Sequence, residues 1–328
     1  MCTSIGMNMG TFYFGRNLDL ECGFGEKVVF TPRNFPFRFR RVGEIPQHFA
    51  MIGMATVMGE VPLYAEAVNE KGLAMAGLNF PGNAFYPETE DEGKANISPF
   101  ELIWWILGQC ETLAQARELL ENTHVIGLPF GPKTPLAPLH WHISDATGSL
   151  VLEVMKDGQH LYENPIGVLT NNPPFPFHLA NVSQYMNLTA KSPENKFGGD
   201  LKPFGQGMGA VGLPGDFSPA SRFVKASFLK LNAVWEEKEG RAGELDKVTQ
   251  FFHILDGVAM VRGSVLTPEG KCDLTRYSCC VDAARGIYYY KTYENNRIAA
   301  IDMGREDMDG DKIKTWELDL EQEVREKN

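Results

Sequence analysis

The chain has no apolar run long enough to cross a bilayer. Its most apolar stretch, residues 102–107, is far shorter than the roughly 20 residues that a membrane-spanning helix needs. The start of the chain lacks both the basic segment and the continuous apolar segment of a secretory leader. We therefore expect a cytoplasmic protein without a membrane span.

Metal-ligand spacing is also missing. The six cysteines form no C-x-x-C pair, and two of them, Cys279 and Cys280, are adjacent and point to opposite faces of any strand. His140 and His142 share a face of a strand, but no further ligands cluster with them, so ordinary strand histidines are expected. We predict reduced thiols and no metal site.

Positive charge is in short supply, with 31 basic against 42 acidic side chains and a net charge of −11. Such a surface repels phosphate backbones, which argues against a nucleic-acid-binding protein. Low-complexity tracts and Pro/Gly-rich linkers are absent as well, and 43% of the residues are hydrophobic. Residues 1–328 are therefore predicted to form a single domain with a full core.

What the chain does contain is blocks of strands and helices. Strand patterns cluster near the start, around residues 140–154 and in the last third. Helix-start signals lie between them at Ser98, Thr112 and Ser218, and a fourth helical pattern covers residues 246–255. Elements in blocks favour antiparallel sheets covered by helices, an α+β fold.

Cys2 is the first candidate for chemistry. Because a small residue follows Met1, we expect Met1 to be removed, leaving the thiol and a free α-amino group of Cys2 on one carbon atom. A thiolate is a strong nucleophile, and an α-amino group, with a pKa of about 7.7–8.0, suits a general base. One residue then supplies both groups, so no cofactor is needed.

A predicted hairpin adds charge beside Cys2. Residues 3–7 and 11–14 read as strands around a turn centred on Met9, which places Arg16 opposite Cys2. Arg16 can stabilise a thiolate, and Asp19 can accept a hydrogen bond from the α-ammonium group.

Motifs along almost the whole chain resemble the choloylglycine hydrolases, the bile salt hydrolases and their penicillin V acylase relatives. In chain order they are Met1-Cys2-Thr3, Phe14-Gly15-Arg16-Asn17-Leu18-Asp19, Pro32-Arg33-Asn34-Phe35, Asn69-Glu70-Lys71-Gly72-Leu73, Gly77-Leu78-Asn79-Phe80-Pro81-Gly82, Gly167-Val168-Leu169-Thr170-Asn171-Asn172-Pro173, Gly212-Leu213-Pro214-Gly215-Asp216, Ser221-Arg222-Phe223, Met260-Val261-Arg262-Gly263-Ser264, Tyr288-Tyr289-Tyr290 and Tyr293-Glu294-Asn295-Asn296.

The resemblance implies the four-layer αββα sandwich of N-terminal nucleophile hydrolases, often assembled as a homotetramer. It also implies cleavage of a linear amide through a thioester on Cys2. By the same resemblance, the backbone N–H of Asn79 and the side-chain amide of Asn171 form an oxyanion hole, and Arg222 completes the charged cluster with Arg16 and Asp19.

The resemblance further implies the substrate class, a glycine- or taurine-conjugated bile acid. Asn79 matches the bile-salt branch, since penicillin V acylases commonly carry tyrosine at that position. An apolar groove for the steroid is expected from Leu18, Met58, Ala65 and Phe130, which as plain core residues would carry no such role. Two alternatives stay open: a penicillin V or other linear-amide acylase, and a non-catalytic protein that binds amphiphiles.

Overall fold

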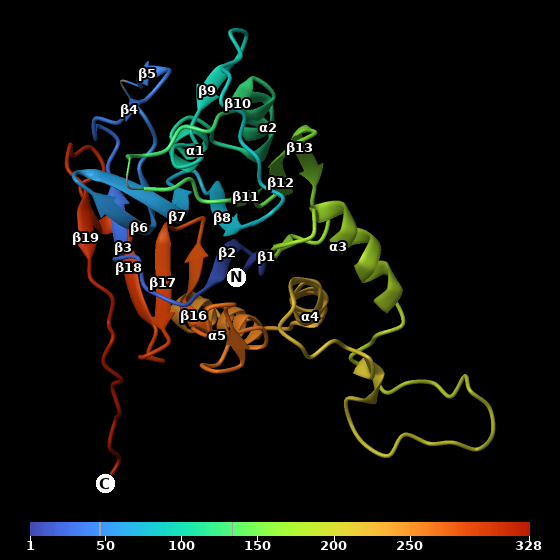
Figure 1. Cartoon of the computed structure of the whole chain (residues 1–328). Coiled ribbons are helices and arrows are strands. Elements are labelled where there is room, and N and C mark those ends of the chain that lie inside the picture. Colours follow the sequence, from blue (N-terminus) through green and yellow to red (C-terminus); the bar gives the residue numbers. More distant parts are fainter. Residues whose placement is uncertain (46, 133) are drawn as a thin grey trace.

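Two large antiparallel sheets form the centre of the computed structural model, which describes residues 1–45, 47–132 and 134–328 (Figure 1). The first sheet contains, in spatial order, β14 (Val168–Leu169), β1 (Cys2–Asn8), β2 (Phe12–Leu20), β16 (Cys272–Asp282), β17 (Ile287–Thr292) and β18 (Ala299–Asp302), with β15 (Val265–Leu266) also paired to β16.

The second sheet packs against the first. It contains, in spatial order, β13 (Gly158–Glu163), β12 (Gly148–Met155), β11 (Leu139–Asp145), β8 (Ala74–Asn79), β7 (Val61–Asn69), β6 (Met51–Met58), β3 (Glu26–Thr31) and β19 (Lys314–Trp316). Smaller pairs are β4 (Arg38–Phe39) with β5 (Gly43–Glu44) and β9 (Ala95–Ile97) with β10 (Thr123–Val125).

Helices cover the outer face of each sheet. The elements on the second sheet are α1 (Leu102–Leu107) and α2 (Leu113–Glu121), and those on the first are α4 (Pro219–Asn232) and α5 (Gly240–Asp256). Further helical segments are α3 (Phe175–Val182), η1 (Ser183–Tyr185), η2 (Met208–Ala210) and η3 (Met303–Arg305). The layers run helix, sheet, sheet, helix, so the predicted αββα sandwich is confirmed.

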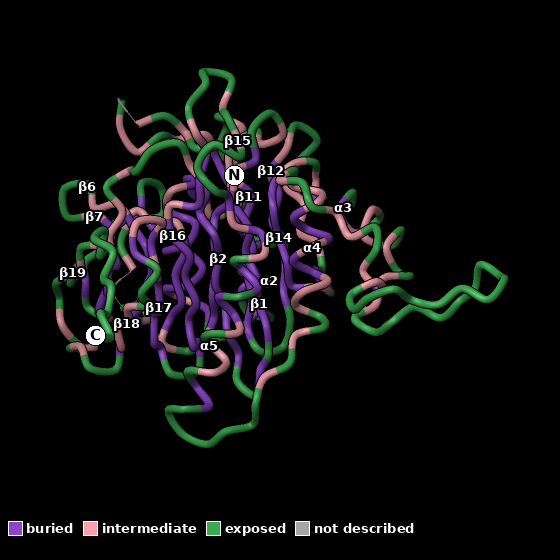
Figure 2. The backbone as a smooth tube through the Cα atoms, turned by 90° about the horizontal axis from the view of Figure 1, so that it is seen from below, coloured by how far each residue is buried: buried purple, intermediate pink, exposed green. Residues whose placement is uncertain are grey.

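Two hydrophobic cores follow from this layering. One joins the facing sides of the sheets and extends to α4 and α5, with Phe14, Phe223 and Phe251 among its buried members. The other lies between the second sheet and α1 and α2, around Trp104 and Trp141. Figure 2 shows buried strands at the centre and exposed loops at the rim.

The helix starts at Thr112 and Ser218 are confirmed, because each side chain caps its helix by accepting a backbone N–H, from Gln115 and Ser221 respectively. The start at Ser98 is wrong. There the hydroxyl is bonded to the Leu128 carbonyl, and α1 begins after Glu101, whose carboxylate accepts the Ser98 N–H at 3.1 Å.

Helix α5 begins at Gly240, earlier than the predicted residue 246. Its added first turn is held by the Glu244 carboxylate, which pairs with Arg241 inside the turn and, outside the helix, pairs with Arg285 and accepts the Tyr289 hydroxyl.

A long arm of residues 186–217 projects from the body between α3 and α4 (Figures 1 and 2). It carries large apolar side chains that are exposed to solvent: Met186, Phe197, Leu201, Phe204 and Val211. Among the described residues, no helix is both long and apolar enough to cross a membrane.

Candidate active site

Cys2 is the first residue of β1 and lies at the open end of the β1–β2 hairpin, opposite its turn. It pairs with Leu18, whereas Arg16 pairs with Ser4, so the predicted register is wrong by two residues. The reason is the loop: Asn8 pairs with Phe12, and the turn is centred on Gly10, whose φ of 82° suits glycine. Because the offset is even, Arg16 stays on the same face of the sheet as Cys2.

Alternation along β2 divides the charged residues between two faces of the first sheet. Arg16 points toward the second sheet, where its Nη1 donates to the carbonyls of Gly77 (2.7 Å) and Ala65 (3.2 Å). Asp19 lies on the opposite face, where its Oδ1 accepts the Thr275 hydroxyl at 2.6 Å. The strand next to Cys2 therefore carries a charged residue on each face of the first sheet.

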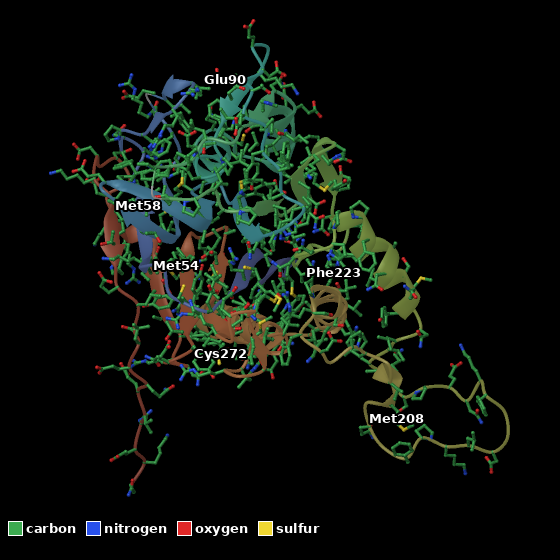
Figure 3. The ribbon with its side chains drawn as sticks, in the orientation of Figure 1. Met54, Met58, Glu90, Met208, Phe223 and Cys272 are labelled. Atoms are coloured by element: carbon green, nitrogen blue, oxygen red, sulfur yellow. The ribbon has the colours of Figure 1, made fainter. Side chains whose placement is uncertain are left out.

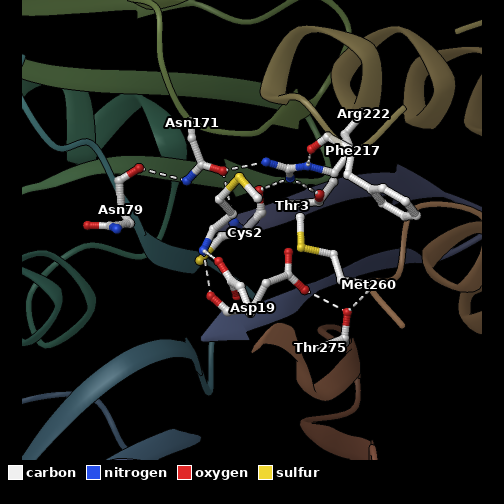
Figure 4. Close-up of polar contacts among 11 residues, drawn as sticks. Cys2, Thr3, Asp19, Asn79, Asn171, Phe217, Arg222, Met260 and Thr275 are labelled. Carbon is white, nitrogen blue, oxygen red and sulfur yellow. Dashed lines mark hydrogen bonds and ion pairs between the residues drawn. The ribbon is translucent and has the colours of Figure 1, made fainter. Parts of the chain in front are cut away.

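Arg222, from α4, holds the backbone around Cys2 (Figure 4). Its Nη1 donates to the Cys2 carbonyl (2.5 Å) and the Thr3 hydroxyl (2.7 Å), and its Nη2 donates to Asn171 Oδ1 (2.6 Å). Its Nε donates to the Phe217 carbonyl at 3.0 Å. Only 2% of the Arg222 surface is exposed, and burial lowers the pKa of its guanidinium, against the attraction of Asp19 and Cys2.

Asn171 links Cys2 to Asn79. Its Oδ1 accepts the Cys2 backbone N–H at 2.9 Å, and its Nδ2 donates to the Asn79 carbonyl at 2.6 Å. An amide nitrogen has two hydrogens, and the second finds no partner in the described parts of the chain. The structure thus brings Cys2, Asn79, Asn171 and Arg222 together, as the sequence predicted.

Acidic groups surround the Arg16 guanidinium. Burial opposes its charge, yet Cys2, Tyr277, Glu66 and Cys279 together raise the pKa of Arg16 above its ordinary value. Arg16 therefore stays positively charged, and Cys2 contributes most among the neighbours that favour this charge.

Asp19 is buried beside the chain start. Its carbonyl accepts the Met1 ammonium group at 2.5 Å, and that ammonium group also lies 3.3 Å from Asp273. Burial raises the pKa of the Asp19 carboxyl, and the Arg222 charge opposes the rise. Asp19 Oδ2 is buried and has no partner among the described residues.

One of the four predicted groove residues, Phe130, lines a cavity in the described part of the chain. Phe130 lines an apolar cavity of about 170 Å³ with Phe100, Ile103, Leu136 and Leu139 among its walls. Leu18 is buried opposite Cys2, and Ala65 contacts Arg16 through its carbonyl. Met58, labelled in Figure 3, is the exposed last residue of β6. Within the described chain, these three residues are not part of the cavity wall.

Several residues of the site carried no motif that the sequence analysis used. Thr275 and Asp273 approach from β16, and Glu66 lies within ion-pair distance of Arg16, at 3.5 Å. Glu66 had a usable signal: it is a lone carboxylate between apolar residues of a strand, which predicts a buried charge with a partner.

His140 and His142 are buried strand residues, as predicted. The two nitrogens of His140 contact the Glu153 carboxylate and the Thr170 carbonyl, and His142 Nδ1 contacts the Ser4 hydroxyl at 2.8 Å. Burial lowers the pKa of His142 to about 3. The contact between His140 and the Thr170 carbonyl fixes the backbone next to Asn171.

The family model described as "Linear amide C-N hydrolases, choloylglycine hydrolase family" matches residues 2–316. A bile salt hydrolase/transferase of Clostridium perfringens is 44% identical over 322 residues, 96% of each chain. One of Lactiplantibacillus plantarum is 42% identical over 320 residues, 97% of each chain.

Solved structures agree with these sequence relatives. The C2A mutant of a conjugated bile acid hydrolase from Clostridium perfringens superposes with a TM-score of 0.91 at 42% identity and full coverage of both chains. A penicillin V acylase from Agrobacterium tumefaciens shares the fold, with a TM-score of 0.74 at 21% identity over 96% of this chain and 90% of its own. The chain belongs to the choloylglycine hydrolase family of linear amide C–N hydrolases.

Proposed function

We propose that this enzyme is a bile salt hydrolase, which cleaves the amide bond of glycine- or taurine-conjugated bile acids with Cys2 as its nucleophile. The observation that carries the proposal is the hydrogen-bonded cluster of Asn171 and Arg222 around Cys2. The relatives named as bile salt hydrolases, which match over nearly the full chain, support the substrate class.

Removal of Met1 converts the Cys2 amide nitrogen into an α-amino group. In the structure this nitrogen lies 2.9 Å from Asn171 Oδ1, which can orient the free amine in the same way. Asp19 Oδ2, buried without a partner in the described chain, supports a second role as the acceptor for the ammonium form. The amine then serves as the general base for the adjacent thiol.

The reaction proceeds through a thioester. The Cys2 thiolate attacks the amide carbonyl, and the oxyanion accepts hydrogen bonds from the free N–H of Asn171 Nδ2 and from the Asn79 backbone N–H. The protonated α-amine gives its proton to the leaving glycine or taurine nitrogen as the C–N bond breaks. Water then attacks the thioester, the amine takes a proton from it, and the bile acid leaves with the thiol restored.

Arg16 and Arg222 have different electrostatic roles in this mechanism. Arg16 stabilises the thiolate from the side of the second sheet, and Arg222 fixes the Cys2 carbonyl and the Asn171 amide from the side of α4. The thioester can also pass its acyl group to an acceptor other than water, which would give the transferase activity in the names of those relatives.

For the steroid we propose a groove that includes Leu18, beside the nucleophile, and the apolar cavity at Phe130. Ligand pockets usually enclose about 300–1,000 Å³, more than the roughly 170 Å³ found here. The proposed groove must therefore extend beyond this cavity. Ala65 and Met58 stay candidates for the rim of this groove.

The test is kcat/KM of protein lacking Met1 on glycine- and taurine-conjugated bile salts and on penicillin V, with Cys2→Ala as the control. Bile-salt turnover that Cys2→Ala abolishes is the expected result. Faster turnover of penicillin V would make the enzyme an acylase of the same mechanism. Activity that survives in Cys2→Ala would overturn the mechanism.

A non-catalytic amphiphile-binding protein is the alternative from another class. Such a protein would have no use for the assembled cluster around Cys2. Intact mass after brief exposure to iodoacetamide separates the two, since an activated Cys2 is alkylated before the exposed Cys22.

We further propose a homotetramer in the cytoplasm. The exposed apolar side chains of the arm, Phe197 and Phe204 above all, support burial against other copies of the chain, and the six free cysteines support a reducing compartment. Replacement of both phenylalanines by serine should lower the mass measured by light scattering. An unchanged mass would assign assembly to another surface.

A further inference from the structure

Glu66 is a carboxylate buried between the two sheets, with 1% of its surface exposed. It lies on β7, yet its partners come from the other sheet. Its Oε2 accepts the Tyr277 hydroxyl at 2.7 Å, and its Oε1 accepts the Tyr288 hydroxyl at 2.6 Å and faces Cys279 Sγ at 3.6 Å. Burial raises the pKa of each of these three donors, so all of them keep their protons at neutral pH.

A β-bulge aims this carboxylate inward. Ala65 is the extra residue where the register between β6 and β7 shifts. Tyr64 and Ala67 pack on the outer side of the sheet, against the core of α1 and α2, whereas Val68 belongs to the core between the sheets. The bulge reverses the alternation so that Glu66 points between the sheets, and it turns the Ala65 carbonyl toward Arg16.

Glu66 and Cys2 both interact electrostatically with the Arg16 guanidinium. Glu66 Oε2 lies 3.5 Å from Arg16 Nη1, and the Arg16 Nε has no partner in the described chain. Burial raises the pKa of Glu66, while Arg16 and the hydroxyls of Tyr288 and Tyr277 oppose the rise. Arg16 and the hydroxyls of Tyr277 and Tyr288 can all donate to the carboxylate oxygens, an arrangement that suits the ionised form of Glu66.

We propose that Glu66 is a positioning residue that limits the positive charge Arg16 presents to the Cys2 thiolate. The inference rests on the proposed function, in which that thiolate is the nucleophile. The charged and titratable groups that face Glu66 are Arg16 from β2, Tyr277 and Cys279 from β16 and Tyr288 from β17. Those that act on Cys2 are Arg16 and Arg222, with Asp19 next to Arg222.

The consequence is a pH profile. When Glu66 loses its charge, Arg16 is left with Cys2 as its remaining anionic neighbour, and the thiolate becomes more stable. Glu66→Gln should move the midpoint of Cys2 alkylation to lower pH by less than about one unit, because Glu66 acts through Arg16 and a directly adjacent charge produces about 1–3 units. Glu66→Asp draws the carboxylate back from Arg16 and should move it in the same direction by less.

The experiment follows iodoacetamide alkylation of Cys2 against pH by mass spectrometry, using full-length protein without Met1. Glu101→Gln is the matched control: Glu101 is equally buried, at 1% exposed, but accepts the backbone N–H groups of Arg40 and Ser98 and makes no contact with Arg16. Its midpoint should equal that of the unsubstituted protein.

We expect the alkylation midpoint to lie at the lowest pH in Glu66→Gln, at a higher pH in Glu66→Asp and at the highest pH in the unsubstituted protein. Superimposed profiles, or a shift to higher pH, would overturn the proposal. If Glu66→Gln does not fold, the direction of the Glu66→Asp shift decides alone. Alkylation needs no substrate, so a shift without bile-salt turnover would retain the role of Glu66 and reject the proposed substrate.

Discussion

Replacement of Arg222 by methionine removes a buried charge while it keeps an unbranched side chain in the same space. Arg222 donates to four oxygen atoms, on Cys2, Thr3, Asn171 and Phe217, and its charge offsets that of buried Asp19. Arg222→Met therefore leaves the Asn171 amide unsupported and the Asp19 carboxylate without its main positive neighbour.

The size of the effect follows from these contacts. Loss of one partner from a buried pair of charges typically costs about 3–5 kcal/mol of unfolding free energy. Because domains are stable by roughly 5–15 kcal/mol, most of the variant should still fold. If the cost comes from Asp19, then Asp19→Asn should relieve part of it, with a coupling energy of about 0.5–3 kcal/mol in a double-mutant cycle.

The pH dependence of the unfolding free energy gives a second, independent test of the link between Arg222 and Asp19. Burial already raises the folded-state pKa of Asp19 above its unfolded value, and the loss of Arg222 raises it further. The folded state then binds more protons than the unfolded state in that window, so stability falls as pH rises through it. The cost of Arg222→Met should accordingly be larger at pH 7 than at pH 5, and Asp19→Asn should remove the difference.

Urea unfolding at both pH values, at one fixed protein concentration, measures all four proteins of the cycle. Additive free energies, or an Arg222→Met cost that is the same at pH 5 and pH 7, would refute the link between Arg222 and Asp19. The hydrogen bonds to Cys2 and Asn171 would then account for the whole effect.

Three further predictions concern the proposed oxyanion hole, the first sheet and a partly buried lysine. Asn171→Ala should lower kcat by about 10²–10³-fold in steady-state kinetics, and a fall below tenfold would contradict its role. Gly15→Ala places a methyl group 2.0 Å from the Cys279 carbonyl and should cost about 3 kcal/mol or more in urea unfolding. Gly205→Ala, with open space around it, is the control, and equal midpoints would contradict the prediction. Burial lowers the pKa of Lys230 to about 8, so the unfolded state binds more protons above pH 8 and Lys230 makes stability rise toward pH 10 by up to about 3 kcal/mol. Lys230→Met should abolish that rise, and an unchanged slope would contradict it.

Much of this enzyme was predictable from local pattern. Blocks of strands and helices gave the layered α+β class, and the capping residues Thr112 and Ser218 marked their helix starts because an N-cap is decided within one turn. The face shared by Cys2 and Arg16 also followed from alternation alone. The register of β1 and β2 did not follow from the pattern, because it depends on the turn between them. We predicted a turn centred on Met9, whereas the structure has it centred on Gly10.

The surroundings of the nucleophile were decided by contacts between distant segments. Tyr277 and Tyr288 reach Glu66 across 211 and 222 residues of chain, and Arg222 reaches Cys2 across 220. The spacing of residues along the sequence does not predict these contacts, because they form only when the sheets and helices pack together.

The bulges show the same division. In β7 the extra residue Ala65 turns Glu66 inward, and in β16 a register shift between Thr275 and Tyr277 sends these side chains to opposite faces, one to Asp19 and the other to Glu66. A regular strand would place residues two apart on one face. The sequence by itself indicated which residues are candidates for the chemistry. The tertiary structure decided which charges meet, because a single inserted residue reverses the alternation on which every prediction of facing side chains depends.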